Sequence, residues 1–176
     1  DDTKVHLENF ISSLIESKVN VEEIDLNNLI LESSEIHKKI SGYEFKRSIS
    51  AERFHHYNEL SDILRNGRLS DGENMSLSDY HYLFDQLERH KHMINNKISS
   101  YDCIISPSAL GEALNGLEYT GSPVLNTTWT LLGLPSITLP MFKSKNNLPI
   151  GCQFISKKAD DNNLLSISKK ILLEFS

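Results

Sequence analysis

Three pairs of adjacent serines are the residues of this chain that could supply a nucleophile: Ser12-Ser13, Ser33-Ser34 and Ser99-Ser100. A serine hydroxyl attacks a carbonyl effectively only when a base accepts its proton and backbone amides stabilise the oxyanion. Glycine next to the serine allows the strained turn or close backbone approach that this requires. None of the pairs has a flanking glycine cluster, and all lie on or beside predicted helices. We therefore interpret them as surface or capping residues of helices.

The seven histidines raise the question of a metal site. Their visible groups are His55-His56, His81 and His90-x-His92. Helix residues one or two positions apart point to different faces, whereas metal-binding pairs favour a spacing of three or four. No set of Cys, Asp or Glu with ligand spacing accompanies them, so we predict solvated histidines and no metal. The chain also lacks a P-loop, a dinucleotide fingerprint and a metalloprotease motif, and we expect no cofactor.

The apolar pattern predicts helices in the first part of the chain. Helical spacing predicts an amphipathic helix over 4–18, with Thr3 as its N-cap. A long helical region is expected to end at Gly67, before a polar loop over 67–75. From Ser78 the apolar residues recur at four, seven and four positions, which predicts a long helix that ends near Ser99-Ser100.

Strands are expected only after that helix. Residues 103–105 form a short apolar run typical of a buried strand, and 107–123 hold so many prolines and glycines that we predict a long loop of a functional kind. A short helix over 126–132 should stop at Gly133. Strands over 136–139, closed by Pro140, and over 150–156 could pair as a hairpin. A last helix follows the N-cap candidates Asp160 and Asp161.

Composition limits the classes of function. The 176 residues, 39% hydrophobic and 24% charged, suit one globular domain or a large piece of one. The formal charge is −6 and the cations are scattered, so nucleic acid is not an expected partner. No apolar run is long enough to span a membrane, and the start resembles no signal peptide. Cys103 and Cys152 are interpreted as buried free thiols, so we expect a cytoplasmic protein, and the missing initiator methionine indicates a fragment.

Several motifs in a fixed order resemble the C-terminal part of amidase-signature enzymes, in particular of the general bacterial type. They are Tyr101-Asp-Cys-Ile-Ile-Ser-Pro-Ser, Leu117-Glu-Tyr-Thr-Gly-Ser-Pro, the run from Asn126 to Pro140, Leu148-Pro-Ile-Gly-Cys-Gln-Phe-Ile, and Asp160-Asp-Asn-Asn-Leu-Leu. Each piece is weak alone, but together they extend over about 75 residues. The loop departs from the family pattern, because Glu112-Ala113 is followed by leucine where a proline is usual.

The resemblance implies an α/β fold, namely the C-terminal portion of the amidase-signature fold with a mixed sheet flanked by helices. It implies that 1–176 are one segment of a single amidase domain, with 1–100 mainly helical and 101–176 forming the strand-loop-strand-helix part. Family members hydrolyse carboxamide C–N bonds with a serine nucleophile, a second serine on a cis peptide and a lysine base. None of these catalytic residues can be carried over to this chain, and the family's serine-rich stretch lies upstream of the matched region.

The resemblance also implies a site. Thr120, Gly121, Asn126 and Trp129 would wall or support a cavity for a small-molecule amide, although a turn at Gly121 and a core position for Trp129 are equally plain interpretations. We expect the chain to be inactive alone, with no membrane partner, and a homo-oligomer stays open. The alternatives are a non-catalytic binding module and one piece of a split amidase completed by another chain. A fragment should expose an apolar face near Cys103, Ile137 and Phe154, whereas a free-standing module should cover it.

Overall fold

In the computed structural model, which describes residues 2–175, the elements are all helical up to residue 98 and every described strand lies after that point. The elements in order are α1 (Asp2–Glu16), α2 (Asn27–Ser48), α3 (Ser50–His55), η1 (Tyr57–Glu59), η2 (Leu64–Arg68), α4 (Leu69–Asp71), α5 (Leu77–Ile98), β1 (Ile104–Pro107), α6 (Val124–Leu132), β2 (Ser136–Lys143), β3 (Pro149–Ile155) and α7 (Asp161–Phe175). The chain divides into two compact units, which are described separately: Asp1–Leu26 with Met93–Ser176, and Asn27–His92.

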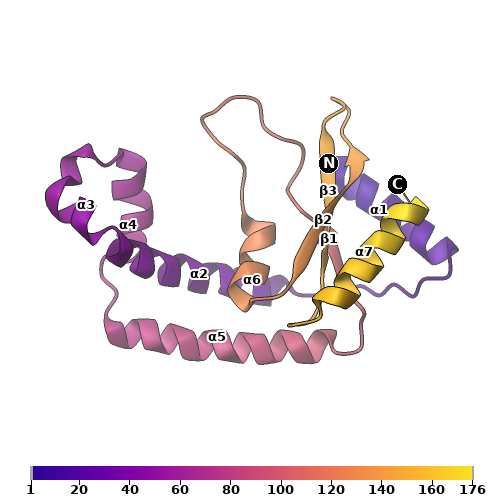
Figure 1. The fold of residues 1–176 in the computed structure, drawn as a ribbon, viewed down its shortest axis with the longest axis horizontal. Coiled ribbons are helices and arrows are strands. Elements are labelled where there is room, and N and C mark those ends of the chain that lie inside the picture. Colours follow the sequence, from indigo (N-terminus) through magenta and orange to yellow (C-terminus); the bar gives the residue numbers. More distant parts are fainter. Residues whose placement is uncertain (1, 176) are drawn as a thin grey trace. The chain divides into compact units, whose positions relative to one another are not determined.

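The first unit is built on a three-stranded sheet in the order β1-β3-β2 (Figure 1). The β2–β3 hairpin predicted from the sequence is confirmed, and β1 pairs with the other side of β3. The α/β fold class is confirmed as well. Both strand pairings are antiparallel, so the expected mixed pairing does not occur among the described strands.

One face of this sheet is apolar and is covered by α1 and α7, which lie together on the same side of it in Figure 1. The register places Ile105, Phe154 and Ile137 in one row across the three strands. Phe154 is fully buried and makes an edge-to-face contact with Phe10 of α1, with ring centroids 6.4 Å apart. Leu164 and Ile171 of α7 complete the same core.

The expectation of an exposed apolar face at the strands is therefore wrong. Phe154 has no exposed surface, while Cys103 and Ile137 are partly buried and pack against the α1–α7 core. The physical reason is that α1 lies far from the strands in sequence but covers them in space, and helical periodicity alone does not indicate which face a helix covers.

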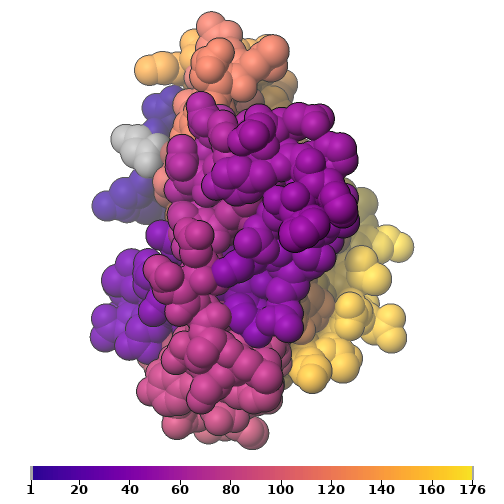
Figure 2. All heavy atoms as spheres, turned by 90° about the vertical axis from the view of Figure 1, so that its left-hand side faces the viewer, coloured from indigo at the N-terminus to yellow at the C-terminus, as the bar shows by residue number. Residues whose placement is uncertain are grey.

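The second unit is helical, and its surface is purple and magenta in Figure 2. Within it, the backbone of α2 lies close to the end of α4. Gly42 lies in α2 and Gly72 follows α4. A Cβ atom built on Gly72 would lie 2.5 Å from Tyr43 N and 2.6 Å from Gly42 O, closer than real Cβ atoms approach backbone. The two backbones touch because both positions lack a side chain.

Both cysteines are free and lie in or against the α1–α7 core. Burial away from water disfavours the charged thiolate, and it raises the pKa of Cys103 to about 11 and that of Cys152 to about 12. The prediction of a buried free thiol is confirmed for Cys152, whereas Cys103 is free and half-buried.

We expect iodoacetamide to alkylate these cysteines very slowly in the folded chain at pH 8. Only the thiolate reacts, and raising a thiol pKa from 9.0 to about 11 lowers its thiolate fraction roughly a hundredfold, with a larger reduction for Cys152. Mass spectrometry of the labelled chain should show full labelling in guanidinium chloride and almost none in buffer. Fast labelling of both thiols in buffer would show that the core opens readily.

Candidate functional site

The sheet face opposite the α1–α7 core carries polar side chains, and this face is the candidate site. The register aligns Ser106 of β1, Gln153 of β3 and Thr138 of β2 in one row. This row alternates with the apolar row of Phe154, because successive side chains of a strand point to opposite faces. Gln153 is only 3% exposed, so its amide must find partners inside the protein.

Those partners form a chain of hydrogen bonds from β1 to α6. Ser106 Oγ donates to Gln153 Oε1 (3.4 Å), and Gln153 Nε2 donates to Asn126 Oδ1 (2.8 Å). Asn126 Nδ2 in turn donates to the backbone carbonyl of Ser108 (2.9 Å), and Ser108 Oγ donates to the carbonyl of Gly151 (3.1 Å). These bonds fix the orientation of both amide side chains.

Gly151 and Gly133 shape this face. A side chain at Gly151 would collide with Ser108 Oγ and with Thr138 Cγ2, so a larger residue would have to displace both side chains. Gly133 adopts φ +67° and ends α6, and its N–H donates to the carbonyl of Thr130. The predicted stop of this helix at Gly133 is confirmed.

Residues 108–123 form the expected long loop, which Figure 1 shows as an excursion between β1 and α6. Glu112 ties this loop to the β2–β3 turn, since Ser144 Oγ and Asn146 Nδ2 both donate to its carboxylate. Both hydrogen bonds lower the pKa of Glu112, because they stabilise its charged form, and the bond from Ser144 has the larger effect. The loop is therefore anchored near its start.

The four residues proposed from the resemblance lie in different surroundings. Asn126 belongs to the hydrogen-bonded row, whereas Trp129 lies on the same helix and is only 4% exposed. Gly121 has φ +96°, a conformation that favours glycine, and Thr120 before it is exposed. The structure thus joins Asn126 to Gln153, Ser106 and Ser108, which were not proposed. The available signal for Gln153 was an amide side chain within the otherwise apolar strand β3.

A chain of carboxylate, imidazole and hydroxyl occurs in the helical unit. Ser33 Oγ lies 3.2 Å from His90 Nδ1, and His90 Nε2 lies 3.1 Å from Glu32 Oε2. The order of groups is that of a serine-hydrolase triad. Ser33, however, has no exposed surface, so no substrate carbonyl can reach its hydroxyl. The interpretation of Ser33 as a surface serine and of His90 as a solvated histidine is wrong, because the two form a buried bond between α2 and α5.

Three serines of the other two pairs donate hydrogen bonds to backbone carbonyls that lie nearby in the sequence. Ser12 Oγ and Ser13 Oγ donate to the carbonyls of Glu8 and Asn9 in their own helix, and Ser99 Oγ donates to Asn96 O. Among residues 2–175, no three His, Cys, Asp or Glu side chains are grouped so as to hold a metal ion. None of the helices described is both long enough and apolar enough to cross a bilayer.

Comparison with known proteins gives a consistent picture. A family model described as Amidase matches residues 1–165. One subunit of the mitochondrial glutamyl-tRNA(Gln) amidotransferase of Ornithorhynchus anatinus is 26% identical over 146 residues, which are 73% of this chain and 28% of that protein. The corresponding subunit of Rickettsia bellii (strain RML369-C) is 36% identical over 84 residues, 44% of this chain and 17% of that protein. The chain therefore spans less than a third of the length of these relatives.

Solved structures share the fold. A crystal structure of an amidase superposes with a TM-score of 0.85 and 19% identity, covering 99% of this chain and 42% of the other. A structure of fatty acid amide hydrolase superposes with a TM-score of 0.77 and 18% identity, covering 97% and 36%.

Proposed function

Because the chain belongs to the Amidase family, we propose that it is the C-terminal part of an amidase-signature hydrolase and that the whole protein cleaves carboxamide C–N bonds. The observation that carries this proposal is the superposition of nearly the whole chain on less than half of an amidase. In this proposal both units belong to one amidase domain, and the nucleophilic serine, the relay serine and the lysine base lie outside the 176 residues. The chain alone then catalyses nothing.

Three serines of the adjacent pairs are consistent with that assignment. A nucleophile must be exposed to substrate and must have a base within hydrogen-bond reach. Ser33 has a histidine partner but no exposed surface, and Ser12 and Ser13 donate to carbonyls of their own helix. None of them combines exposure with a base.

The sheet and the loop support a larger parent domain. Among the described strands, β1 and β2 each pair on one side only, so further strands of a larger sheet have an edge to join. The loop after β1 exposes Leu110, Leu117 and Tyr119, and Leu117 is 97% exposed. Apolar side chains gathered in one loop are normally covered by protein, and the rest of an amidase domain would cover them.

The polar row supports a role in holding an amide. A carboxamide offers one acceptor and one NH₂ donor group, and the half-buried side chain of Asn126 carries the same pair, with one lone pair and one N–H left beyond its bonds to Gln153 and Ser108. In the proposal, Asn126 and the loop residues Thr120 and Gly121 wall the cavity for a small-molecule amide, Gln153 fixes the orientation of the Asn126 side chain, and the buried Trp129 supports the helix that carries Asn126. These neutral groups position the substrate, and the upstream residues supply the proton transfer.

A second candidate is favoured by the covered sheet face. Since α1 and α7 bury Phe154 completely, the first unit has a core of its own. A piece that folds alone could act as one chain of a split amidase or as a non-catalytic binding module. The relatives compared above are subunits by name, so partner chains belong to this proposal too. Because both cysteines are free, one buried and one half-buried, either form suits the cytoplasm.

The test is ammonia release from a panel of simple carboxamides by the purified 176-residue chain, with circular dichroism to verify folding. We expect no release above the buffer blank, whereas enzymes typically accelerate reactions by at least about a millionfold. Clear turnover would overturn the proposal, and the exposed serines would then be replaced one by one. The assay is repeated with the upstream part of a related amidase added as a separate chain. Restored release would favour the split enzyme, and saturable amide binding without release would favour the binding module.

A further inference from the structure

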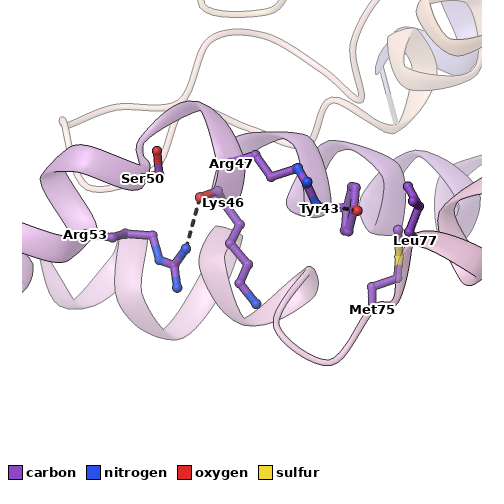
Figure 3. Close-up of a pocket in the computed structure, with 7 residues that line it drawn as sticks. All are labelled: Tyr43, Lys46, Arg47, Ser50, Arg53, Met75 and Leu77. Atoms are coloured by element: carbon purple, nitrogen blue, oxygen red, sulfur yellow. Dashed lines mark hydrogen bonds between the residues drawn. The ribbon is translucent and has the colours of Figure 1, made fainter.

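The helical unit Asn27–His92 contains a pocket of about 540 Å³ whose wall is strongly basic (Figure 3). Lys46 and Arg47 near the end of α2 line it, together with Arg53 from α3. Ser50 adds a hydroxyl. All of the lining residues come from this one unit, so the pocket is complete within it.

Each cation is held at the wall by a neutral acceptor. Lys46 Nζ donates to the backbone carbonyl of Glu73 (2.7 Å), and Arg53 Nη1 donates to the carbonyl of Lys46 (3.1 Å), the bond dashed in Figure 3. The Arg47 guanidinium donates to the Tyr43 hydroxyl and lies 4.9 Å from the centre of the Tyr43 ring. These single bonds restrict the side chains and leave other N–H donors for a ligand, because lysine has three donors and arginine five.

No carboxylate neutralises these three cations. Within residues 2–175, no Asp or Glu oxygen lies within 4.0 Å of the Lys46, Arg47 or Arg53 nitrogens, although other cations of the unit, such as Lys38 and Arg65, do form ion pairs. The whole chain has a formal charge of −6. Three unpaired like charges around one pocket repel each other, and a bound anion would remove that repulsion.

We propose that this pocket binds a small organic phosphate. Two guanidinium groups and an ammonium match the charge and the several oxygens of a phosphate better than those of a single carboxylate, and guanidinium forms paired hydrogen bonds with phosphate oxygens. Met75 and Leu77 line the pocket as well, and Figure 3 shows them beside Tyr43. They provide an apolar surface for the organic part of the ligand. This inference is independent of the proposed amidase function.

The probes are phenyl phosphate and inorganic phosphate, titrated into the 176-residue chain by isothermal calorimetry at constant ionic strength. Phenyl phosphate should bind saturably with a stoichiometry of one, and roughly tenfold more tightly than inorganic phosphate, because its ring is buried against the apolar wall. R47Q/R53Q should weaken binding at least about tenfold, since it removes two charge-assisted contacts. R89Q removes an exposed arginine elsewhere in the same unit and should change the affinity by less than about twofold.

Circular dichroism melts check that each variant folds. If R47Q/R53Q does not fold, K46Q tests the same pocket without disturbing the contact between Arg47 and Tyr43. Absence of saturation up to about 10 mM phenyl phosphate would overturn the proposal, as would equal binding by wild type and the pocket variants. A sedimentation assay with vesicles of phosphatidylcholine and phosphatidylglycerol gives a further test. If the chain bound these vesicles and phenyl phosphate did not displace it from them, the proposal would also be overturned, because the basic surface would then serve a membrane.

Discussion

Replacing Gly72 with valine is expected to unfold the helical unit or to lower its free energy of unfolding by at least about 3 kcal/mol, the upper end of the usual cost of overpacking. The new Cβ would overlap the backbone of Gly42 and Tyr43 in α2. Backbone atoms in a helix cannot turn aside as a flexible side chain can, so α2 and the end of α4 would have to separate. Urea denaturation followed by circular dichroism measures the loss.

Gly67→Ala is the matched control. A Cβ at Gly67 meets nothing within 4 Å, and Gly67 lies inside the helical turn η2. Alanine favours helical backbone over glycine, so this variant should be more stable by about 0.5–1 kcal/mol. If Gly72→Val were as stable as Gly67→Ala, the close contact between α2 and α4 would not exist in solution.

Phe154→Ala is expected to cost about 3–5 kcal/mol of unfolding free energy, the usual range for removing a buried phenylalanine. Phe154 has no exposed surface and contacts Phe10 of α1 edge to face. Alanine would leave a cavity at the centre of the α1–α7 core, lined by strands that cannot close it. The denaturation midpoint in guanidinium chloride, followed by near-ultraviolet circular dichroism, reports the change.

The same change at an exposed phenylalanine provides the comparison. Phe54 in α3 is 83% exposed, so Phe54→Ala should alter stability by no more than about 0.5 kcal/mol. A small effect of Phe154→Ala would mean that α1 or α7 does not cover the sheet in solution, and the first unit would then lack a core of its own.

Elements with a strong local signal were predicted well from the sequence. The long helix predicted from Ser78 is α5 (Leu77–Ile98), and the last helix begins at Asp161, directly after its expected cap. Gly133 ends α6 in the left-handed conformation, as its position indicated. In each case, helical periodicity and a capping residue agree, and nothing distant in the chain has to be known.

Elements whose ends depend on tertiary contacts were predicted less well. Thr3 is not an N-cap but a buried residue within α1, which begins at Asp2. Gly67 does not end a helix, because the chain continues through η2 and α4 to Asp71, where Gly72 meets α2. Pro140 does not close β2, which runs on to Lys143 through an irregularity in the ladder between Leu139 and Phe142.

One residue of the candidate site could be predicted from the sequence, whereas its hydrogen-bond partners could not. Asn126 could be proposed from the sequence because it begins a motif of the resemblance. Its partners could not, since Gln153 and Ser108 lie 27 and 18 positions away and are brought together by the sheet register. The buried bond between Ser33 and His90 joins residues 57 positions apart, and no local pattern marks it.

The irregular stretch of β2 at Pro140 has a consequence for the solubility of the isolated chain. An open sheet edge is a template for uncontrolled pairing with other molecules, which is how edge strands start aggregation. Proline has no N–H to offer an incoming strand, and the break in register at Leu139/Phe142 interrupts any straight ladder along this edge. An incoming strand therefore finds a regular ladder only along the first half of β2, and the irregularity at Pro140 opposes the growth of fibres from this edge.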